Sequence, residues 1–164
     1  MNRLSQEEFF KSLPRKIVGA ATVFLNEADE VLMVKPNYRT GWLLPGGAVE
    51  QLESPQEACI RETKEETNLD IVSPKLLSVF FSKRLDVTPK YESLQFIFFG
   101  GKLSSDDIKK IKVQKKELDD FAFYSREEAL KLVGKSLGKR LSASLDALAS
   151  GAFSVYGESE GKGQ

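Results

Sequence analysis

The chain contains no histidine and a single cysteine, Cys59. The lack of histidine excludes catalysis by Ser-His-Asp or Cys-His groups, and it excludes every zinc site that depends on imidazole. One cysteine cannot form an intramolecular disulfide, which is typical of proteins in the reducing cytoplasm. Chemistry in this chain must therefore use carboxylates, hydroxyl groups, Lys, Arg or a bound cation.

The chain also lacks an excess of charge of either sign, since 24 basic residues balance 24 acidic residues. No global field draws such a protein onto nucleic acid or onto an anionic membrane, so we expect neither as a partner. No N-terminal apolar run resembles a signal peptide or a membrane span. With 164 residues, of which 41% are hydrophobic, one domain in the cytoplasm is expected.

The first residues predict a short helix. Ser5 and Glu8 have the form of a capping box, in which each side chain accepts a hydrogen bond from the other residue's backbone amide. Phe9, Phe10 and Leu13 then supply one apolar face. These side chains either cover a sheet or support a homodimer, and the sequence leaves both readings open.

Strands are predicted wherever β-branched and apolar residues run together. Two such runs flank the turn-forming segment 26–29 and predict a hairpin, and a later helical pattern is expected to break near its glycines. The last residues lack apolar content and predict a disordered tail. The predicted strands cover residues 17–25, 30–36, 76–82, 94–99 and 121–124, the helical pattern residues 126–148 with Gly134 and Gly138, and the tail residues 151–164.

A second capping box predicts the central helix. Ser54 and Glu57 have the required spacing, and Pro55 occupies the favoured first helical position. We expect this helix to continue to about Thr67. Asn68 tolerates the left-handed backbone that commonly ends a helix.

Negative charge is concentrated between residues 47 and 69, where six glutamates face only two basic residues. On a helix that turns by about 100° per residue, Glu62, Glu65 and Glu66 share one arc, and the adjacent arc is free to pack. Like charges at this spacing repel by about 0.2–0.5 kcal/mol per pair. Mg²⁺ prefers carboxylate oxygens and would neutralise them while keeping positions for water and phosphate. The packing arc carries Cys59, Ile60, Thr63 and Thr67.

This segment resembles the Nudix box, usually written G-x5-E-x7-R-E-U-x-E-E-x-G-U, where U is a bulky aliphatic residue. All six fixed Gly, Glu and Arg positions match, which chance would produce in about one chain in 10⁵ of this length at about 7% usage per residue type. The segment before it resembles the family's W-x-L-P-G-G sequence. The matching residues are Trp42, Leu44, Pro45, Gly46, Gly47, Glu53, Arg61, Glu62, Glu65 and Glu66.

Three residues depart from the family pattern. Thr63 replaces an aliphatic residue, Asn68 replaces glycine, and Leu52 stands where relatives often have glycine. Asparagine visits the left-handed region readily, and the Thr63 hydroxyl can hydrogen bond to its own helix. None of the three is a proposed metal ligand, so we expect a competent enzyme.

The resemblance implies an α+β fold, the α/β/α Nudix sandwich with a mixed sheet between helices. It places a Nudix hydrolase domain at residues 16–150, after a helical extension at residues 1–15. It also implies that Glu62 and Glu66 bind Mg²⁺, or Mn²⁺ as a substitute, together with Glu65 and the carbonyl of Gly46. Arg61 is then expected to orient Glu53. A solvated acidic helix face is the plain alternative.

Glu117 lies outside the box, shortly before the predicted strand that carries Phe121 and Phe123. Related enzymes often have an additional acid at such a place, so Glu117 is expected to act as a catalytic base or metal ligand beside Glu65 and Glu66. An ordinary surface acid is the alternative.

Substrate contacts are expected from the loop that leads into the box. Lys35 and Arg39 can bind phosphate, and Tyr38 can stack on a base. Trp42 could line the same pocket, although core packing is its more common fate.

The expected reaction is attack of metal-activated water on a phosphorus of a nucleoside diphosphate derivative. The substrate class stays open between a nucleoside triphosphate, oxidised or not, and a nucleotide sugar or ADP-ribose type. A non-catalytic module that senses a nucleotide is the alternative. Such a module would be expected to lose some of the box carboxylates, and all of them are present.

Overall fold

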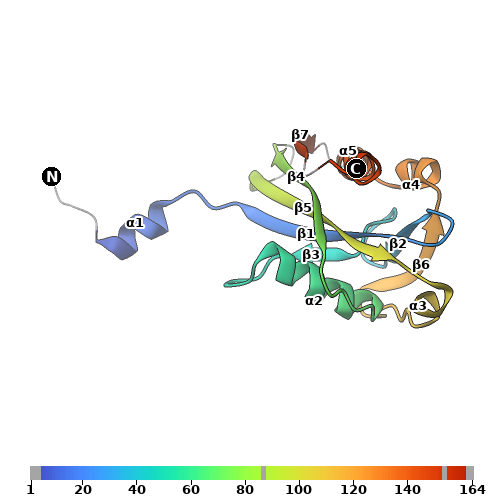
Figure 1. Cartoon of the computed structure of the whole chain (residues 1–164). Coiled ribbons are helices and arrows are strands. Elements are labelled where there is room, and N and C mark those ends of the chain that lie inside the picture. The colour runs from blue at the N-terminus through green and yellow to red at the C-terminus, as the bar shows by residue number, and fades with distance from the viewer. Residues whose placement is uncertain (1–4, 86–87, 153–154, 162–164) are drawn as a thin grey trace.

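The fold is a mixed sheet between two layers of helices, as Figure 1 shows. The strand order is β6-β2-β1-β5-β4-β7, and β3 pairs with the first half of β1. This computed structural model describes residues 5–85, 88–152 and 155–161, with the backbone alone for Arg84 and residues 155–161. The strands are β1 Ile17–Leu25, β2 Val31–Pro36, β3 Gly46–Ala48, β4 Lys75–Arg84, β5 Tyr91–Lys102, β6 Leu118–Tyr124 and β7 Val155–Gly161.

The sheet contains both antiparallel and parallel pairs of strands. The predicted hairpin is confirmed, because β1 pairs antiparallel with β2 and Leu25 lies opposite Val31. β1 also pairs parallel with β5, while β5 pairs antiparallel with β4. The mixed sheet and the α+β class expected from the family resemblance are therefore confirmed.

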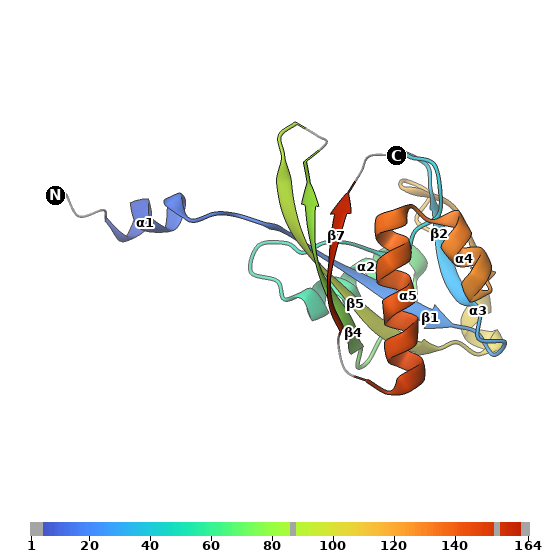
Figure 2. The same cartoon turned by 90° about the horizontal axis from the view of Figure 1, so that it is seen from above.

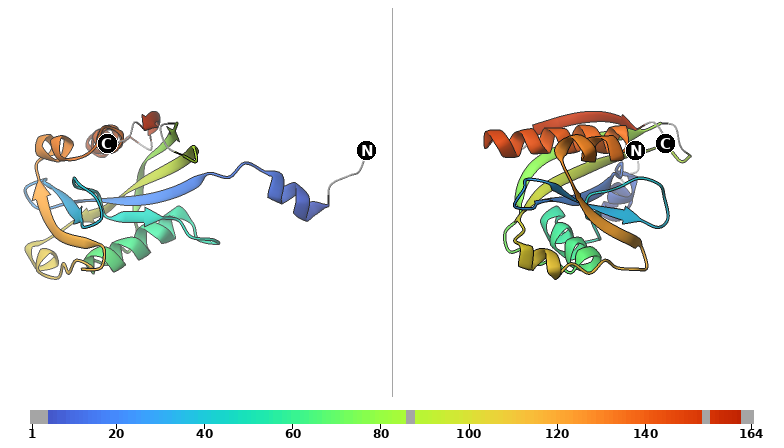
Figure 3. Two further views of the ribbon diagram at one scale, coloured as in Figure 1. Left: turned by 180° about the vertical axis from the view of Figure 1, so that it is seen from behind. Right: turned by 90° about the vertical axis from the view of Figure 1, so that its right-hand side faces the viewer.

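Strand alternation sends neighbouring residues of β1 to opposite faces of the sheet. Ala20 and Phe24 pack in the cluster that contains α2, Pro55–Thr67. Val23 and Leu25 pack in the cluster that contains α5, Lys135–Ser150. Each helix therefore covers its own face of the sheet, and the end-on view of Figure 3 shows the two layers.

The helices confirm most of the predicted boundaries. α2 begins at Pro55 and ends at Asn68, whose φ of 63° is left-handed. The pattern after residue 126 divides at Gly134 into α4, Arg126–Leu132, and α5, whereas Gly138 stays inside α5. Figure 2 shows α5 lying over the sheet. α3, Ser105–Lys109, was not predicted.

α1, Gln6–Ser12, forms as predicted with its complete capping box, yet it buries none of its residues. Phe9 is 51% exposed and Phe10 is 58% exposed. Figures 1 and 3 show the helix held away from the sheet by an extended segment. Phe9 and Phe10 therefore do not cover the sheet of their own chain. Residues 1–4 of the expected extension lie outside the described residues.

The expectation of a disordered tail at residues 151–164 needs correction. Residues 155–161 form β7, which pairs parallel with β4 from Ser78↔Val155 to Arg84↔Gly161. A strand ladder uses backbone amide and carbonyl groups, so a polar sequence without apolar content can still complete an exposed sheet edge. Residues 153–154 and 162–164 lie outside the described residues. Within the described part of the chain, no helix is long and apolar enough to cross a membrane.

Candidate active site

α2 is anchored to the sheet by buried hydroxyl groups on its packing face. The Thr22 hydroxyl of β1 lies 2.8 Å from the Thr63 hydroxyl and 3.0 Å from the Cys59 sulfur. A threonine hydroxyl can also bond to its own helix, and on this helix Thr67 does so by donating to the Thr63 carbonyl at 2.7 Å. The unusual Thr63 is therefore paired with a matching hydroxyl on β1.

Two glycines of β3 allow the carboxylates of α2 to approach the sheet. A Cβ on Gly47 would lie 2.4 Å from Oε1 of Glu62. Gly46 has a φ of 147°, and a Cβ there would lie 2.3 Å from the carbonyl oxygen of Ala20. Gly46 therefore has to be glycine, because a side chain there would meet the backbone of β1. A side chain at Gly47 would instead displace the carboxylate of Glu62 from its position.

Arg61 makes several hydrogen bonds at the edge of the site. Its Nε and Nη2 donate to the two carboxylate oxygens of Glu53 at 2.8 and 2.9 Å, a bidentate pair. This pair and the backbone amide of Glu50 hold the pKa of Glu53 at about 2. Nη1 of Arg61 also donates to Glu62 at 2.8 Å, and Nη2 to the Ala48 carbonyl at 3.1 Å. Arg61 thus joins the loop, β3 and α2.

Glu66 is the buried acid of the group. Its Oε2 accepts a hydrogen bond from the Gly46 amide at 2.8 Å. Burial, together with the charges of Glu62, Glu117 and Glu65, raises the pKa of Glu66 to about 7 despite that bond. Burial also raises the pKa of Glu62, against the opposing effect of Arg61. A cation placed here would stabilise both charged forms.

Glu117 lies at the end of a turn, immediately before β6, and it is exposed. Its charge raises the pKa values of Glu62, Glu66 and Tyr38, so the fold brings it to the carboxylates of α2. The structure therefore places Glu117, which lies outside the box in sequence, near the box carboxylates. Its role as base or metal ligand stays a prediction.

The loop residues expected to contact substrate divide between two faces. Tyr38 is exposed, and its pKa is raised by partial burial and by Glu66 and Glu117, so it stands near the acids. Arg39 is close enough to Tyr38 to oppose that rise. Lys35 is exposed two residues after Met33, on the face of β2 toward α5, so the fold does not bring it to the acids. Trp42 packs edge-to-face on Tyr124 at 5.1 Å between ring centroids, in the core.

The donor set suits a hard divalent cation, although the side chains have not converged on one point. Among the residues that the structure describes, no group of three or more His, Cys, Asp or Glu is arranged to hold a metal ion. Glu62 and Glu65 turn toward Arg61, whereas Glu66 turns toward Gly46. Burial and the neighbouring carboxylates both raise the pKa of Glu62 and of Glu66, so a cation bound between them would relieve the cost of their charged forms. Mg²⁺ favours oxygen ligands of this kind.

Comparison with known protein families decides whether this acidic helix is an ordinary surface helix or the helix of a known family. The NUDIX domain family matches residues 15–144. The chain belongs to the Nudix family. A putative 8-oxo-dGTP diphosphatase of Bacillus subtilis (strain 168) is 37% identical to this Nudix chain over 82 residues, 50% of this chain and 51% of that protein. The chain thus spans about half the length of this curated relative.

Solved structures agree on the Nudix fold. The MutT protein from Methanosarcina mazei Go1 has a TM-score of 0.63 and 26% identity, covering 80% of this chain and 96% of that chain. The NUDIX domain of Shewanella oneidensis NrtR, solved in complex with ADP ribose, has a TM-score of 0.68 and 15% identity, covering 88% and 99%. The second likeness shows the fold alone.

This Nudix domain has two polar residues near the box that we did not predict to lie there. Arg140 of α5 and Gln95 of β5 line a cavity that also reaches Gly46 and Gly47. Two signals in the sequence could have identified them. Gln95 interrupts the apolar run of its strand, and Arg140 lies between Leu137 and Leu141 on the buried side of its helix.

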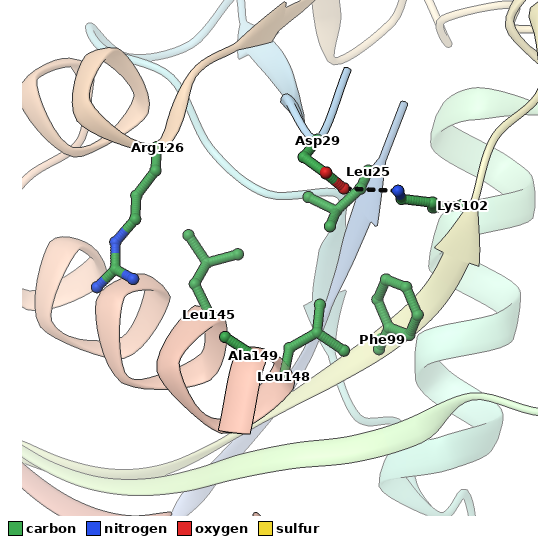
Figure 4. Close-up of a pocket in the computed structure, with 8 residues that line it drawn as sticks. All are labelled: Leu25, Asp29, Phe99, Lys102, Arg126, Leu145, Leu148 and Ala149. Atoms are coloured by element: carbon green, nitrogen blue, oxygen red, sulfur yellow. Dashed lines mark ion pairs between the residues drawn. The ribbon is translucent and has the colours of Figure 1, made fainter. Parts of the chain in front are cut away.

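A larger cavity of about 640 Å³ lies at the other end of α5, and Figure 4 shows its lining. Its walls are mainly apolar, with Leu25, Phe99 and Leu148 among them. Its charged groups are already paired, because Lys102 lies 2.7 Å from Asp29 and Arg126 lies 2.7 Å from Asp146. None of the box carboxylates contributes to this cavity.

Proposed function

We propose that this chain is a Mg²⁺-dependent hydrolase that splits a diphosphate bond in a nucleoside diphosphate derivative. The observation that carries the proposal is the placement of Glu62 and Glu66 against the glycine pair of β3, where Glu62 also meets Arg61 and Glu66 accepts a hydrogen bond from the Gly46 amide. Burial, with a smaller contribution from neighbouring carboxylates that include Glu117, raises the pKa of both acids. A helix that only faces solvent gains no stability from placing carboxylates so close together. A site that binds a cation and a phosphate chain requires carboxylates in this arrangement.

Each acid has a proposed role. Glu62, Glu65, Glu66 and the carbonyl of Gly46 would hold Mg²⁺, with Mn²⁺ as a substitute. The bound ion would supply charge neutralisation on the phosphates and a lower pKa for the attacking water. Glu117, which is exposed and acts on Glu66 through its charge, would accept a proton from the attacking water. Glu65 and Glu66 are proposed as catalytic residues together with Glu117.

Other residues position these groups. Arg61 fixes Glu53 through two hydrogen bonds and restrains Glu62 through a third. Tyr38 and Arg39 are the proposed substrate contacts on the acidic side. Lys35, on the other face of β2, is proposed only for parts of a substrate that extend around the sheet edge.

The proposed substrate is a nucleoside triphosphate, with oxidised forms included. Support comes from the Bacillus subtilis relative, which is named as a putative 8-oxo-dGTP diphosphatase. A nucleotide sugar or an ADP-ribose type of substrate is the second choice, supported by the ADP ribose bound in a protein of the same fold.

A release assay tests this proposal. The purified protein is incubated with 8-oxo-dGTP, dGTP, ADP-ribose and a UDP-sugar, each with Mg²⁺, with Mn²⁺ and with chelator. We expect phosphate, pyrophosphate or nucleoside monophosphate to appear with the metals and not with chelator. No product from any of these compounds in the presence of metal would overturn the proposal.

A nucleotide-sensing module is the alternative function. It would bind a nucleotide from the same panel, with an affinity measurable by calorimetry, and leave it intact over long incubation. The proposed enzyme would instead hydrolyse the same nucleotide.

Two further properties of the chain are proposals. The exposed Phe9 and Phe10 of α1, which meet each other at 5.8 Å between ring centroids, support association of two copies into a homodimer. A cytoplasmic location stays a prediction, which fractionation of cells that produce the protein would test.

A further inference from the structure

The cavity of about 640 Å³ lies beside the last turns of α5, where β1 and β5 end (Figure 4). Pockets for small-molecule ligands commonly measure about 300–1,000 Å³. Asp29 of the turn between β1 and β2, and Arg126, the first residue of α4, complete its lining. Among the described residues, none lines both this cavity and the one that reaches Gly46 and Gly47. A whole small molecule can therefore fit here without meeting the carboxylates of α2.

The walls of this cavity are apolar and come from both the helix and the sheet. Leu145 and Leu148 project from α5, while Leu25 and Phe99 project from the sheet, as Figure 4 shows. Protein interiors normally contain few voids larger than a water molecule. A space of this size between a helix and a sheet leaves apolar side chains without contacts on one side. The apolar body of a ligand would supply those contacts.

Charged groups lie at two places on the lining. Lys102 pairs with Asp29 at 2.7 Å, and the two side chains are 54% and 68% exposed. Arg126 lies on the α4 side, where it donates to Asp146 at 2.7 Å and to the Ser142 hydroxyl at 2.9 Å. Arg126 is thus held by two partners on α5, whereas the partner of Lys102 is an exposed side chain of a turn. Lys102 is therefore the cation that a ligand can engage.

The pair between Lys102 and Asp29 can be exchanged at little cost to the fold. Ion pairs that are this exposed contribute little stability. The turn is held by its backbone, since the Asp29 amide donates to the Asn26 carbonyl at 3.1 Å. A ligand carboxylate can therefore replace Asp29 as the partner of Lys102 while the turn keeps its shape.

The lining also limits how many polar groups a ligand can carry. Among the described residues that line the cavity, the polar side chains are those of Asp29, Lys102 and Arg126. These residues include no amide or hydroxyl side chain that would match the hydroxyl groups of a sugar or the edge of a base. A molecule with an apolar body and one polar end therefore fits this cavity better than a nucleotide does.

We propose that this cavity is a separate ligand site that binds a small amphipathic carboxylate. The apolar body lies between α5 and the sheet, and the carboxylate accepts hydrogen bonds from Lys102 in place of Asp29. Fatty acids of medium chain length belong to this class of ligand. The site does not depend on the proposed hydrolysis, because its described lining contains none of the residues proposed for that reaction.

Calorimetry with decanoate tests the site in the absence of nucleotide and metal. The proteins are the wild type, Lys102→Met, Asp29→Asn and the control Lys131→Met, which breaks an exposed pair of the same 2.7 Å length. We expect Lys102→Met to weaken decanoate binding by about 2- to 5-fold, the effect of one exposed ion pair. Asp29→Asn removes the competing carboxylate at a φ of 60°, which asparagine tolerates, and should strengthen binding by a similar factor. Lys131→Met should bind as the wild type does.

Filling the cavity provides a second measurement. Ala149 is exposed on the lining, so Ala149→Phe can occupy the cavity without removing a buried group. We expect this variant to lose at least about 10-fold in decanoate affinity, because its ring covers the apolar surface that the ligand needs. Lys139→Phe adds the same ring at an exposed residue of α5 outside the cavity and should keep the wild-type affinity. Thermal melts should show that both variants are folded.

Several results would overturn the ligand site. Equal decanoate binding by the wild type, Lys102→Met and Ala149→Phe would place the ligand elsewhere on the protein. Weaker binding by Asp29→Asn would show that its carboxylate does not meet Lys102. Binding that appears only after Phe9 and Phe10 are both replaced by serine would assign the cavity to α1 of a second copy. No binding by any of these proteins at millimolar decanoate would overturn the proposal as well.

Discussion

Glu62, Glu65 and Glu66 lie within about one helical turn but differ in their surroundings. The side chain of Glu62 is 17% exposed and that of Glu65 is 49% exposed, while Glu66 is buried against Gly46. Burial rather than sequence position therefore distinguishes the three acids. The most buried of them combines a pKa of about 7 with a fixed orientation.

Glu66→Gln is expected to lower turnover by at least about 10²-fold, as removal of one catalytic electrostatic contact does. The glutamine oxygen can still accept the hydrogen bond of the Gly46 amide, so the fold should keep its stability. Steady-state kinetics with saturating Mg²⁺ and a thermal melt measure the two effects. Glu127→Gln, an exposed acid on α4, is the control. Wild-type turnover in Glu66→Gln would contradict the assigned role.

Leu52 departs from the family pattern at a residue that adopts a φ of 67° and is 99% exposed. A left-handed backbone costs a residue with a Cβ about 1–2 kcal/mol, while the freedom of glycine in the unfolded chain costs about 0.5–1 kcal/mol. Leu52→Gly should therefore stabilise the protein by about 0.5–1 kcal/mol, measured by urea unfolding. Leu52→Ala keeps the Cβ and should gain nothing. A destabilised glycine variant would show that this backbone strain is absent.

At the residue scale, the sequence predicted what a contiguous motif can encode. The Arg61–Glu53 pair and the acids of α2 follow from spacing along one segment, and the structure brings them together. Arg140 and Gln95 could not be predicted in the same way, because they come from elements far apart in sequence. Only the packing of α5 on β5 brings them to one cavity.

At the scale of elements, α2 depends on a buried hydroxyl pair with β1. Thr63→Val restores the aliphatic residue of the family pattern but leaves the Thr22 hydroxyl with only the Cys59 sulfur. We expect a loss of about 1–3 kcal/mol in the free energy of unfolding, because a buried polar group loses its partner. Replacing both threonines by valine should recover most of this loss. Equal and additive losses in a double-mutant cycle would show that the two hydroxyls do not interact.

The N-terminal cap of α3 contains the carboxylate of Asp107, which becomes protonated in acid. Hydrogen bonds from Ser104 and Lys110 lower the pKa of Asp107 to about 2. Between the ordinary pKa of about 4 and this value, the unfolded chain binds more protons than the folded chain, so stability falls as the pH is lowered. Glu53, with a pKa of about 2, contributes in the same direction.

Asp107→Asn should therefore be less stable than the wild type at neutral pH and should lose less stability on acidification. Urea unfolding at about pH 6 and about pH 3 measures the difference. Asp106→Asn, which changes an exposed neighbour paired with Lys109, should follow the wild-type pH dependence. An identical acid loss in both variants would contradict the assignment to Asp107.

At the scale of the whole molecule, α1 stands apart from the sandwich with both phenylalanines exposed. If two copies associate through this helix, light scattering after size exclusion should give the mass of a dimer for the wild type. Phe9→Ser with Phe10→Ser should give a monomer. Val72→Ser, a change at another highly exposed apolar residue, should remain dimeric. A monomeric wild type at high concentration would contradict the homodimer.

The overall architecture was predictable because the family resemblance implies the fold and the apolar runs locate its strands. β7 was not predictable, since residues 155–161 contribute backbone pairing to β4 through a polar sequence. α3 was missed because five residues give too short a pattern for helical periodicity to be visible.

The glycine pair of β3 has a consequence for mutation of the acidic site. A Cβ at Gly46 would meet the backbone of β1, whereas a Cβ at Gly47 would meet only the end of the Glu62 side chain. Gly46 therefore sets how closely β3 approaches β1, and Gly47 sets where the Glu62 carboxylate rests.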